Sequence, residues 1–410
     1  MSTEPTPTTI PGLRPLTGRD PHEQHRAASP LELLLDLSFV VAFGVAGQQF
    51  AHLIAVGHFW EGLLGFGFAA YAIIWAWVNF SWFASAFDTD DWLYRLTVML
   101  QMVGVTVLAL GLPDMFHSIE TGHFDNHVMV AGYIVMRVAM LGMWGRVAVT
   151  SPKYRSTALV YIVTLSVAQL GWAVMSAINP SLTLALILAP FLIGIEVAGP
   201  FLAERGKVET PWHPHHIAER YGLLAIIALG EGVIGTVASV GAVVQEHGWS
   251  TEAALVVIAG IGLTFSMWWL YFSVPFGDLL HAHRERAFIF GYGHILLFAA
   301  IAAVGAGLHV AAYVVEGEAS IGDTTAVASV AMPVLVYFLV GFVIRSAMAG
   351  LDRRVLGLAL ATSAILLLAV GLTNVGVGMG ACLIVAMLAP VVSVVGFEIL
   401  KHRDPNFVSS

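Results

Sequence analysis

Charged residues are scarce in this chain of 410 residues, since Asp, Glu, Lys and Arg make up 11% of it and the apolar set makes up 58%. Soluble globular domains carry about 25% charged and about 45–50% apolar residues. So few charges cannot cover a globule of this size in water, and the mean hydropathy of +0.82 agrees. The composition excludes a soluble fold and indicates a protein that crosses a lipid bilayer several times.

Cysteine and an excess of basic residues are also missing. The single cysteine, Cys382, lies in an apolar run, so neither a disulfide within the chain nor a cysteine metal site is expected. The formal net charge of −9 argues against a nucleic acid partner, which requires a basic stripe. No Gly-rich phosphate loop, nucleophile elbow or His-Glu-x-x-His helix is present. We therefore expect no cofactor and no separate catalytic domain.

Long apolar runs are abundant. A helix that crosses a bilayer needs about 20 mainly apolar residues, and backbone polar groups in lipid must bond to each other. About twelve stretches qualify, near residues 31–56, 60–87, 93–112, 127–148, 157–178, 182–199, 216–244, 252–274, 287–315, 326–347, 355–373 and 378–399. The sequence therefore predicts an all-α integral membrane protein with about twelve transmembrane helices.

The basic residues fall on one side of these predicted helices. Lys and Arg in short loops stay on the cytoplasmic side of a membrane. With a cytoplasmic N-terminus, the inner segments collect the Lys and Arg residues, while the outer loops at 113–126 and 316–323 contain none. Only Arg137, inside the fourth predicted helix, belongs to neither group. We expect a multipass protein of the plasma (inner) membrane with both termini cytoplasmic.

The first 28 residues are polar and rich in proline. This composition predicts a disordered cytoplasmic arm over residues 1–28. Ser29, Pro30 and Glu32 then match the capping box that begins a helix, with serine as the N-cap and proline in the first turn. The first transmembrane helix should therefore start close to residue 30.

The two halves of the chain resemble each other at an offset of roughly 190 to 200 residues. Ala189-Pro190 corresponds to Ala389-Pro390, and Arg146 corresponds to Arg345. We expect two parallel six-helix repeats at residues 29–205 and 215–400, joined by a cytoplasmic linker at 206–214 and followed by a cytoplasmic tail at 401–410. An even number of helices gives both repeats the same orientation. Chance similarity between apolar helices is the alternative.

Several charged residues fall inside predicted helices. A charge in the hydrocarbon costs about 2.5 to 3.5 kcal/mol, so Arg137 requires an acidic partner or an aqueous cavity. Asp36 and Glu231 are the expected partners. Glu196 and Glu398 are weaker candidates because they lie near the inner ends of the sixth and twelfth predicted helices.

These buried residues have two interpretations. They can form structural salt bridges that fix helix packing, or a charge site whose protonation or substrate contact changes between two states. Glycines on both sides of Glu231, which permit close approach of a helix or ligand, favour a function for that carboxylate. His294, inside the ninth predicted helix, can relay a proton or hydrogen-bond a neighbouring carbonyl.

Histidines gather before two predicted helices, at His213, His215 and His216 and at His281 and His283. Clustered imidazoles can bind zinc. Their spacing matches no specific metal motif, so no metal site is assigned.

Five segments resemble the low-temperature-requirement A (LtrA) family of bacterial membrane proteins. They are RAASPLELLLDLSFV (26–40), FDTDDWLYR (87–95), YIVMR (133–137), HIAERYGLLAIIALGE (216–231) and YGH (292–294). This chain has Leu34-Leu35 where the family reads Phe-Phe before the aspartate. The resemblance implies a multipass plasma-membrane protein but no substrate or reaction. The polar residues of these segments are candidate supporting residues: Arg26, Glu32, Asp91, Arg95, His216, Glu219 and Arg220.

Three classes of function fit these observations. A secondary transporter or ion- or proton-coupled permease for a small solute or ion is favoured by the duplicated helices and buried charges. Its candidate substrate- or proton-coupling residues are Asp36, Arg137, Glu231 and His294. An intramembrane enzyme acting on lipid or envelope precursors and a non-transporting assembly or stress factor are the alternatives. Apart from the lipid bilayer, no partner, substrate or oligomeric state is assigned.

Overall fold

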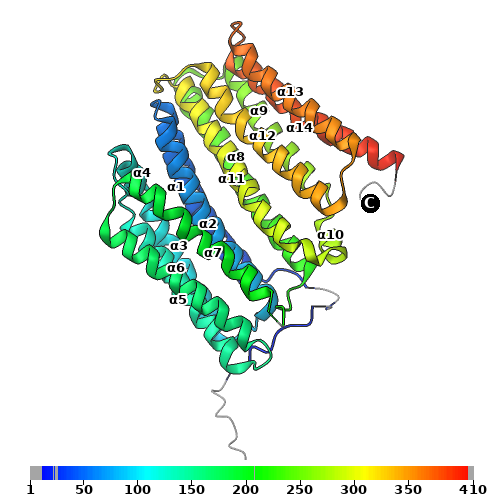
Figure 1. The fold of residues 1–410 in the computed structure, drawn as a ribbon. Coiled ribbons are helices and arrows are strands. Elements are labelled where there is room, and N and C mark those ends of the chain that lie inside the picture. The colour runs from blue at the N-terminus through cyan, green and yellow to red at the C-terminus, as the bar shows by residue number, and fades with distance from the viewer. Residues whose placement is uncertain (1–11, 22, 24–25, 207, 405–410) are drawn as a thin grey trace, which may run out of the picture.

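The computed structural model describes residues 12–21, 23, 26–206 and 208–404. Residues 1–11, 22 and 24–25 of the predicted arm, Lys207 of the predicted linker and residues 405–410 of the predicted tail lie outside it. Its regular structure is helical, apart from an isolated bridge between His123 and Ser181. Figure 1 shows long helices that run roughly side by side. In chain order they are α1 (Pro30–Ala55), α2 (Phe59–Phe87), α3 (Trp92–Leu110), α4 (Leu112–Glu120), α5 (His127–Thr150), α6 (Arg155–Ile178), α7 (Leu182–Glu204), α8 (Pro214–His247), α9 (Thr251–Phe272), α10 (Phe276–Ala282), the short 3-10 helix η1 (Arg284–Arg286), α11 (Ala287–Val315), α12 (Asp323–Ala349), α13 (Arg353–Thr373) and α14 (Met379–Arg403).

Twelve segments of the described chain are helices long and apolar enough to cross a membrane. This confirms the predicted all-α class and the predicted number of spans. Three spans contain two helical elements each. α3 and α4 share the third span, α9 and α10 share the eighth, and η1 leads into α11 in the ninth.

α4 corrects one predicted boundary. The sequence predicts a loop at 113–126, but α4 extends the third span to Glu120. Pro113 lies in the first turn of α4, where a missing N–H is tolerated. At Gly111, between α3 and α4, an added Cβ would lie 2.2 Å from the backbone nitrogen of Met129. Only glycine permits this close approach between the start of α4 and the first turn of α5.

α1 begins as the capping box predicts. The N–H of Glu32 donates to Ser29 Oγ at 3.2 Å, and the N–H of Ser29 donates to Glu32 Oε2 at 2.7 Å. Two backbone N–H groups that have no partner within the helix thereby gain a hydrogen-bond acceptor. The capping bond occupies Oε2 of Glu32, and its second oxygen, Oε1, faces α8.

The segment before α1 packs onto the ends of the helices. Leu16 is fully buried, and its N–H donates to Thr150 Oγ1 at 3.1 Å. Arg26 donates to the carbonyl groups of Ala84 and Ser85 in the last turn of α2, and burial lowers the pKa of its guanidinium to about 10. The described residues of the predicted arm thus have no regular secondary structure, and Leu16 and Arg26 among them are buried against helix ends. The disorder expected for residues 1–28 stays a prediction.

The first half, α1 to α7, lies beside the second half, α8 to α14 (Figure 1). In the first half α3, α5, α6 and α7 pack in series, and in the second half α11, α12, α13 and α14 do so. α14 also packs along α9, whereas α2 packs mainly on α1 and α11. The halves share one series of contacts and differ in another, so the predicted six-helix repeat stays a prediction.

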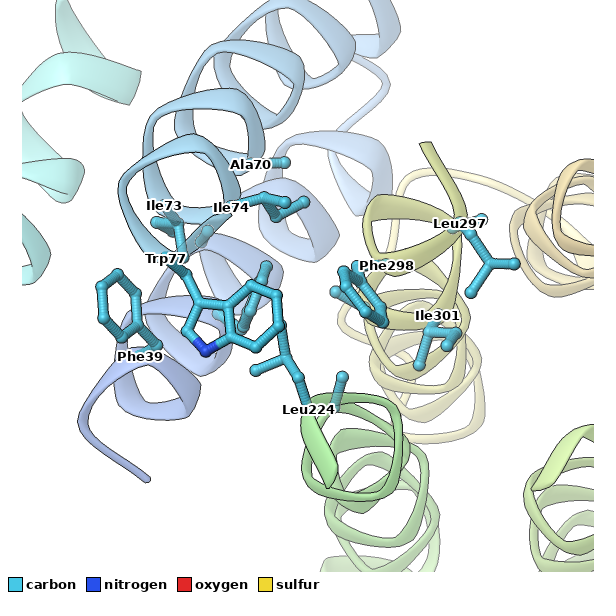
Figure 2. Packing of buried hydrophobic residues seen from close by; sticks show 14 of the residues in the cluster. Phe39, Ala70, Ile73, Ile74, Trp77, Leu224, Leu297, Phe298 and Ile301 are labelled. Carbon is cyan, nitrogen blue, oxygen red and sulfur yellow. The ribbon is translucent and has the colours of Figure 1, made fainter. Parts of the chain in front are cut away.

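The two halves meet where α1 and α2 contact α8 and α11. Trp77 of α2 fills this junction. Its ring contacts Tyr221 of α8 and Phe298 of α11 edge to face, with 5.0 and 5.8 Å between ring centroids. Figure 2 shows Trp77 between Phe39 and Phe298, above Leu224. Because buried aromatic rings dominate the energetics of such contacts, Trp77 helps to hold the halves together.

The two ends of the bundle differ in charge. The end that carries residues 12–28, which we call the basic end, also holds the arginines and lysines at the helix termini, among them Arg95, Arg146, Arg155, Arg205, Arg353 and Lys401. The segments at the opposite end, 56–58, 121–126, 179–181, 248–250, 316–322 and 374–378, contain no Lys or Arg. The structure thus keeps the charge separation on which the predicted orientation depends.

Candidate functional site

A cluster of charged side chains lies buried at the junction of the halves. Arg220 of α8 forms ion pairs with Glu32 Oε1 and with Asp36 Oδ1 of α1, both at 2.6 Å. The indole N–H of Trp77 donates to the same Asp36 oxygen at 2.7 Å. His216 Nε2 lies 3.4 Å from Glu32. We call these five residues the Arg220 cluster, and all of them are at most 1% exposed.

Helical spacing explains why the cluster forms. Glu32 and Asp36 are four residues apart on α1, and His216 and Arg220 are four residues apart on α8, so each pair lies on one helix face. The two faces oppose each other across the junction. With a neutral imidazole and both carboxylates ionised, these five residues carry two negative charges and one positive charge.

A second buried cluster lies within the first half. Glu196 of α7 accepts hydrogen bonds from Tyr133 (2.7 Å), Tyr71 (3.1 Å) and Gln169 (2.8 Å). Arg137 of α5 donates to the hydroxyl of Tyr133 and lies 3.8 Å from Glu196 Oε2. We call these five residues the Arg137 cluster. Its one positive and one negative charge balance.

This cluster corrects the predicted partner of Arg137. The guanidinium pairs with Glu196, and not with Asp36 or Glu231. Glu196 was expected near the end of a span that stops at 199, but α7 continues to Glu204. The carboxylate therefore lies eight residues, or about 12 Å along the helix, from the end of α7. The predicted span ends before Pro200, a residue that often ends a helix, but in the structure Pro200 lies inside α7.

Glu231 lies apart from both clusters. Its carboxylate oxygens would lie 3.1 and 3.4 Å from a Cβ added to Gly44 of α1, and its own Cβ would lie 2.8 Å from one added to Gly305 of α11. The two glycines thus make room for Glu231 where α1, α8 and α11 meet. No hydrogen bond or ion pair from another described residue reaches this carboxylate, and the residue is 8% exposed.

His294 of α11 is fully buried among aromatic rings. Its Nδ1 lies 2.7 Å from the carbonyl oxygen of Phe290, and its Nε2 lies 3.0 Å from the hydroxyl of Tyr271. A neutral imidazole satisfies both contacts by donating from Nδ1 and accepting at Nε2. These bonds agree with the hydrogen-bonding interpretation of His294, although they do not test its role.

The remaining predicted residues lie at the basic end. Asp91 accepts from Arg146 at 3.0 Å and from the N–H of Arg14 at 3.2 Å. Although burial acts in the opposite direction, these bonds, that of Arg146 foremost, lower the pKa of Asp91 to about 2. Arg95 pairs with Asp90 at 2.8 Å on the surface. This network ties the segment before α1 to α3 and α5.

Glu219 is exposed and accepts from the N–H of Ala28 at 3.3 Å. It lies beside Arg220 in sequence but on the outer face of α8, so the structure does not bring it into the Arg220 cluster. In the described part of the chain, no group of three or more His, Cys, Asp or Glu side chains could hold a metal ion.

A cavity of about 590 Å³ lies at the basic end, and we call it the aromatic vestibule. α2, α5, α6, α7 and α11 line it, together with Arg205, Gly206, Glu209, Thr210, Trp212, Arg284 and Glu285. Nine of its lining residues are aromatic: Trp75, Trp82, Phe83, Trp144, Tyr161, Phe201, Trp212, Phe288 and Tyr292. None of Asp36, Arg137 and Glu231 lines it. These three candidate coupling residues therefore do not line a common cavity, and no ion pair joins any two of them.

The vestibule adjoins the Arg137 cluster. The ring of Trp75, in the vestibule wall, stacks on Tyr71 at 6.2 Å between centroids, and Tyr71 donates to Glu196. The indole N–H of Trp75 and two nitrogens of Arg137, Nε and Nη1, are buried without a hydrogen-bond partner. The wall of the vestibule and the Arg137 cluster are thus connected through the contact between Trp75 and Tyr71, and both contain buried N–H groups without a hydrogen-bond partner.

The sequence alone does not reveal this cavity, because a tryptophan in a membrane helix can also pack against a neighbour or anchor at the interface. The sequence does contain one indication of a shared surface: Trp75 and Trp82 are seven residues apart and therefore lie on one face of α2. The partners that complete the wall come from α5, α6 and α11, and only the fold brings these together.

The twelve apolar helices and the buried charge clusters define a multipass helical membrane protein. Residues 27–390 match the family described as Bacterial low temperature requirement A protein (LtrA), and the chain belongs to this family. An uncharacterized protein of Rhizobium meliloti (strain 1021) is 24% identical over 293 residues, which are 67% of this chain and 66% of that protein. The chain thus covers slightly less than two thirds of this relative. No solved structure matches the chain.

Proposed function

We propose that the protein is a proton-coupled secondary transporter of the plasma membrane. The observation that carries this proposal is the Arg220 cluster, in which two carboxylates share one guanidinium at the junction of the halves. Charged residues inside membrane proteins mark ion and proton pathways. Transporters also hold their coupling sites between halves that move against each other.

The Arg220 cluster has one more carboxylate than guanidinium groups, and this excess of negative charge favours the binding of a proton. A proton on His216 or on either carboxylate makes the cluster neutral, and neutral clusters are cheaper to bury. Every ion pair between Arg220 and α1 crosses the junction. Relative movement of α1 and α8 therefore changes these distances and with them the affinity for the proton.

The aromatic vestibule supplies the solute pathway. Residues of both halves line it. It lies at the basic end, which the distribution of Lys and Arg assigns to the cytoplasm. Solute therefore enters from the cytoplasm in the state that this structure represents.

The orientation can be tested by cysteine labelling. Cys382 is buried, so its replacement by alanine gives a background for single cysteines. Exposed Glu318 and Val375 lie at one end, and exposed Lys153 and Arg353 at the basic end. In intact cells, an impermeant maleimide should label cysteine at the first two positions and not at the last two. Labelling of a basic-end position from outside would reverse the proposed orientation.

Proton coupling can be tested in proteoliposomes that carry a pH gradient and an internal pH-sensitive dye. A panel of small ammonium compounds, carboxylates, amino acids and sugars is added in turn. At least one solute should drive a proton flux, and Asp36→Asn should reduce it by at least tenfold. The same variant should retain or gain stability, because it removes the surplus charge while keeping shape and hydrogen bonding to Trp77.

The matched control is Asp114→Asn, which changes an exposed carboxylate on α4 and should leave the flux unchanged. If no solute in the panel evokes flux from correctly folded protein, the transport proposal fails. A non-transporting assembly factor would then be favoured, since Asp36, Arg137 and Glu231 do not surround a common cavity.

A further inference from the structure

The walls of the aromatic vestibule are suited to positive charge. Nine of the 21 lining residues are aromatic, and ring faces attract cations through their electron-rich π-systems. Among these residues Trp82, Phe288 and Tyr292 are partly exposed, so a bound molecule can reach their rings, whereas Trp75, Trp144 and Trp212 are buried. Because the attraction grows when water is excluded, a cation in the cavity would gain more from the accessible rings than one on the outer surface of the protein.

The chain's own cations already use two of these rings. The guanidinium of Arg284 lies 3.9 Å from the ring centroid of Trp212, and that of Arg205 lies 3.8 Å from the centroid of Phe201. Arg284 also donates to the carbonyl of Trp212 at 3.0 Å, which fixes it at the edge of the cavity. In both contacts the cation lies over the face of the ring at a distance of less than 4 Å. A bound organic cation can use the same geometry.

The charges of the lining point the same way. Among the described residues that line the vestibule are three carboxyl groups, of Glu204, Glu209 and Glu285, and two guanidinium groups, of Arg205 and Arg284. Glu204 is held by Tyr161 and Thr210, whereas Glu209 is exposed at the mouth. An excess of carboxylates beside aromatic rings favours a cation over an anion.

We infer that the aromatic vestibule binds small organic cations whose positive charge is shielded by alkyl or aryl groups. The volume of about 590 Å³ falls within the range of about 300–1,000 Å³ typical of small-molecule sites. A strongly hydrated metal cation or ammonium ion gains less from such walls than an alkylated one, which loses little hydration on entry. This inference names the substrate class of the proposed transporter and rests on that proposal for its biological meaning.

Binding can be measured without any gradient, on the purified full-length protein in lipid nanodiscs. Isothermal titration with phenyltrimethylammonium should give saturable binding, and benzenesulfonate, an anion of similar size, should bind at least tenfold more weakly. Phe288→Leu removes a ring of the wall, and Glu209→Gln removes a carboxylate at the mouth. Each should weaken phenyltrimethylammonium binding at least fivefold.

The matched controls lie outside the cavity. Phe191→Leu changes an exposed ring on the outer side of α7, and Glu318→Gln changes an exposed carboxylate at the opposite end. Both should bind like the unaltered protein. Absence of saturable binding, equal binding of benzenesulfonate, or unchanged binding in both vestibule variants would overturn the inference. Binding without flux would contradict the transport proposal alone, and flux with another solute but no cation binding would contradict only this inference.

Discussion

Arg220→Gln should lower the free energy of unfolding by about 3–5 kcal/mol, because removal of one partner from a buried ion pair leaves an uncompensated charge. Here the loss leaves two carboxylates, of Glu32 and Asp36, close together and without a cation. One of them will take up a proton, which limits the cost but does not remove it. Unfolding in mixed detergent micelles, followed by tryptophan fluorescence, measures the change.

Two further variants separate charge from packing. Arg353→Gln removes an exposed arginine at the start of α13 and should change stability by less than about 0.5 kcal/mol. Adding Glu32→Gln and Asp36→Asn to Arg220→Gln makes the cluster neutral and should restore at least half of the loss. If Arg220→Gln is no more harmful than Arg353→Gln, the cluster does not hold the halves together. If the neutral combination restores nothing, packing and not charge explains the effect.

The number and approximate positions of the transmembrane spans could be predicted from the sequence, because the bilayer imposes one physical requirement on all of them. A backbone in hydrocarbon must form helix, and a helix must be long enough to cross, so apolar runs reveal each span. The start of α1 was equally accessible, since Ser29 and Glu32 satisfy each other's backbone donors within four residues. Both features are local in sequence, and local features are what a single sequence encodes directly.

The pairing of charges was not predictable in the same way. Arg137 and Glu196 are 59 residues apart and come from α5 and α7, and Arg220 and Asp36 are 184 residues apart. The sequence shows that each buried charge needs a partner, but several carboxylates satisfy that need equally well. Only the packing of helices decides among them. The predicted depth of Glu196 was also misleading, because the predicted span ends before Pro200, whereas α7 continues through this proline to Glu204.

The vestibule was the least predictable feature. An aromatic residue in a membrane helix packs against a neighbour, anchors at the interface or lines a cavity, and its sequence environment is the same in all three cases. Trp75 and Trp77 are two residues apart, yet Trp77 fills the junction of the halves while Trp75 lines the vestibule. Their opposite roles follow from the helical rotation between them, combined with the position of α11.

Glu196→Leu should be more destabilising than Arg137→Met, although the two side chains form one ion pair. Loss of Glu196 leaves the guanidinium buried, and arginine cannot lose its proton to become neutral. It also leaves the donors of Tyr71 and Gln169 without their acceptor. The expected loss is about 3–5 kcal/mol in the free energy of unfolding. Loss of Arg137 is milder, because Glu196 keeps three hydrogen-bond donors and can take up a proton.

The double variant Arg137→Met with Glu196→Leu tests whether the pair itself is responsible. It replaces both charges with apolar side chains of similar size, and such a replacement is often close to neutral. It should therefore be more stable than Glu196→Leu alone, with a coupling free energy of about 2–3 kcal/mol in the cycle. Arg353→Met is the matched control on an exposed arginine. Equal losses for the two single variants would show that the hydrogen bonds of Glu196 contribute little, and strictly additive losses in the double variant would show that Arg137 and Glu196 do not interact across the 3.8 Å that separates them.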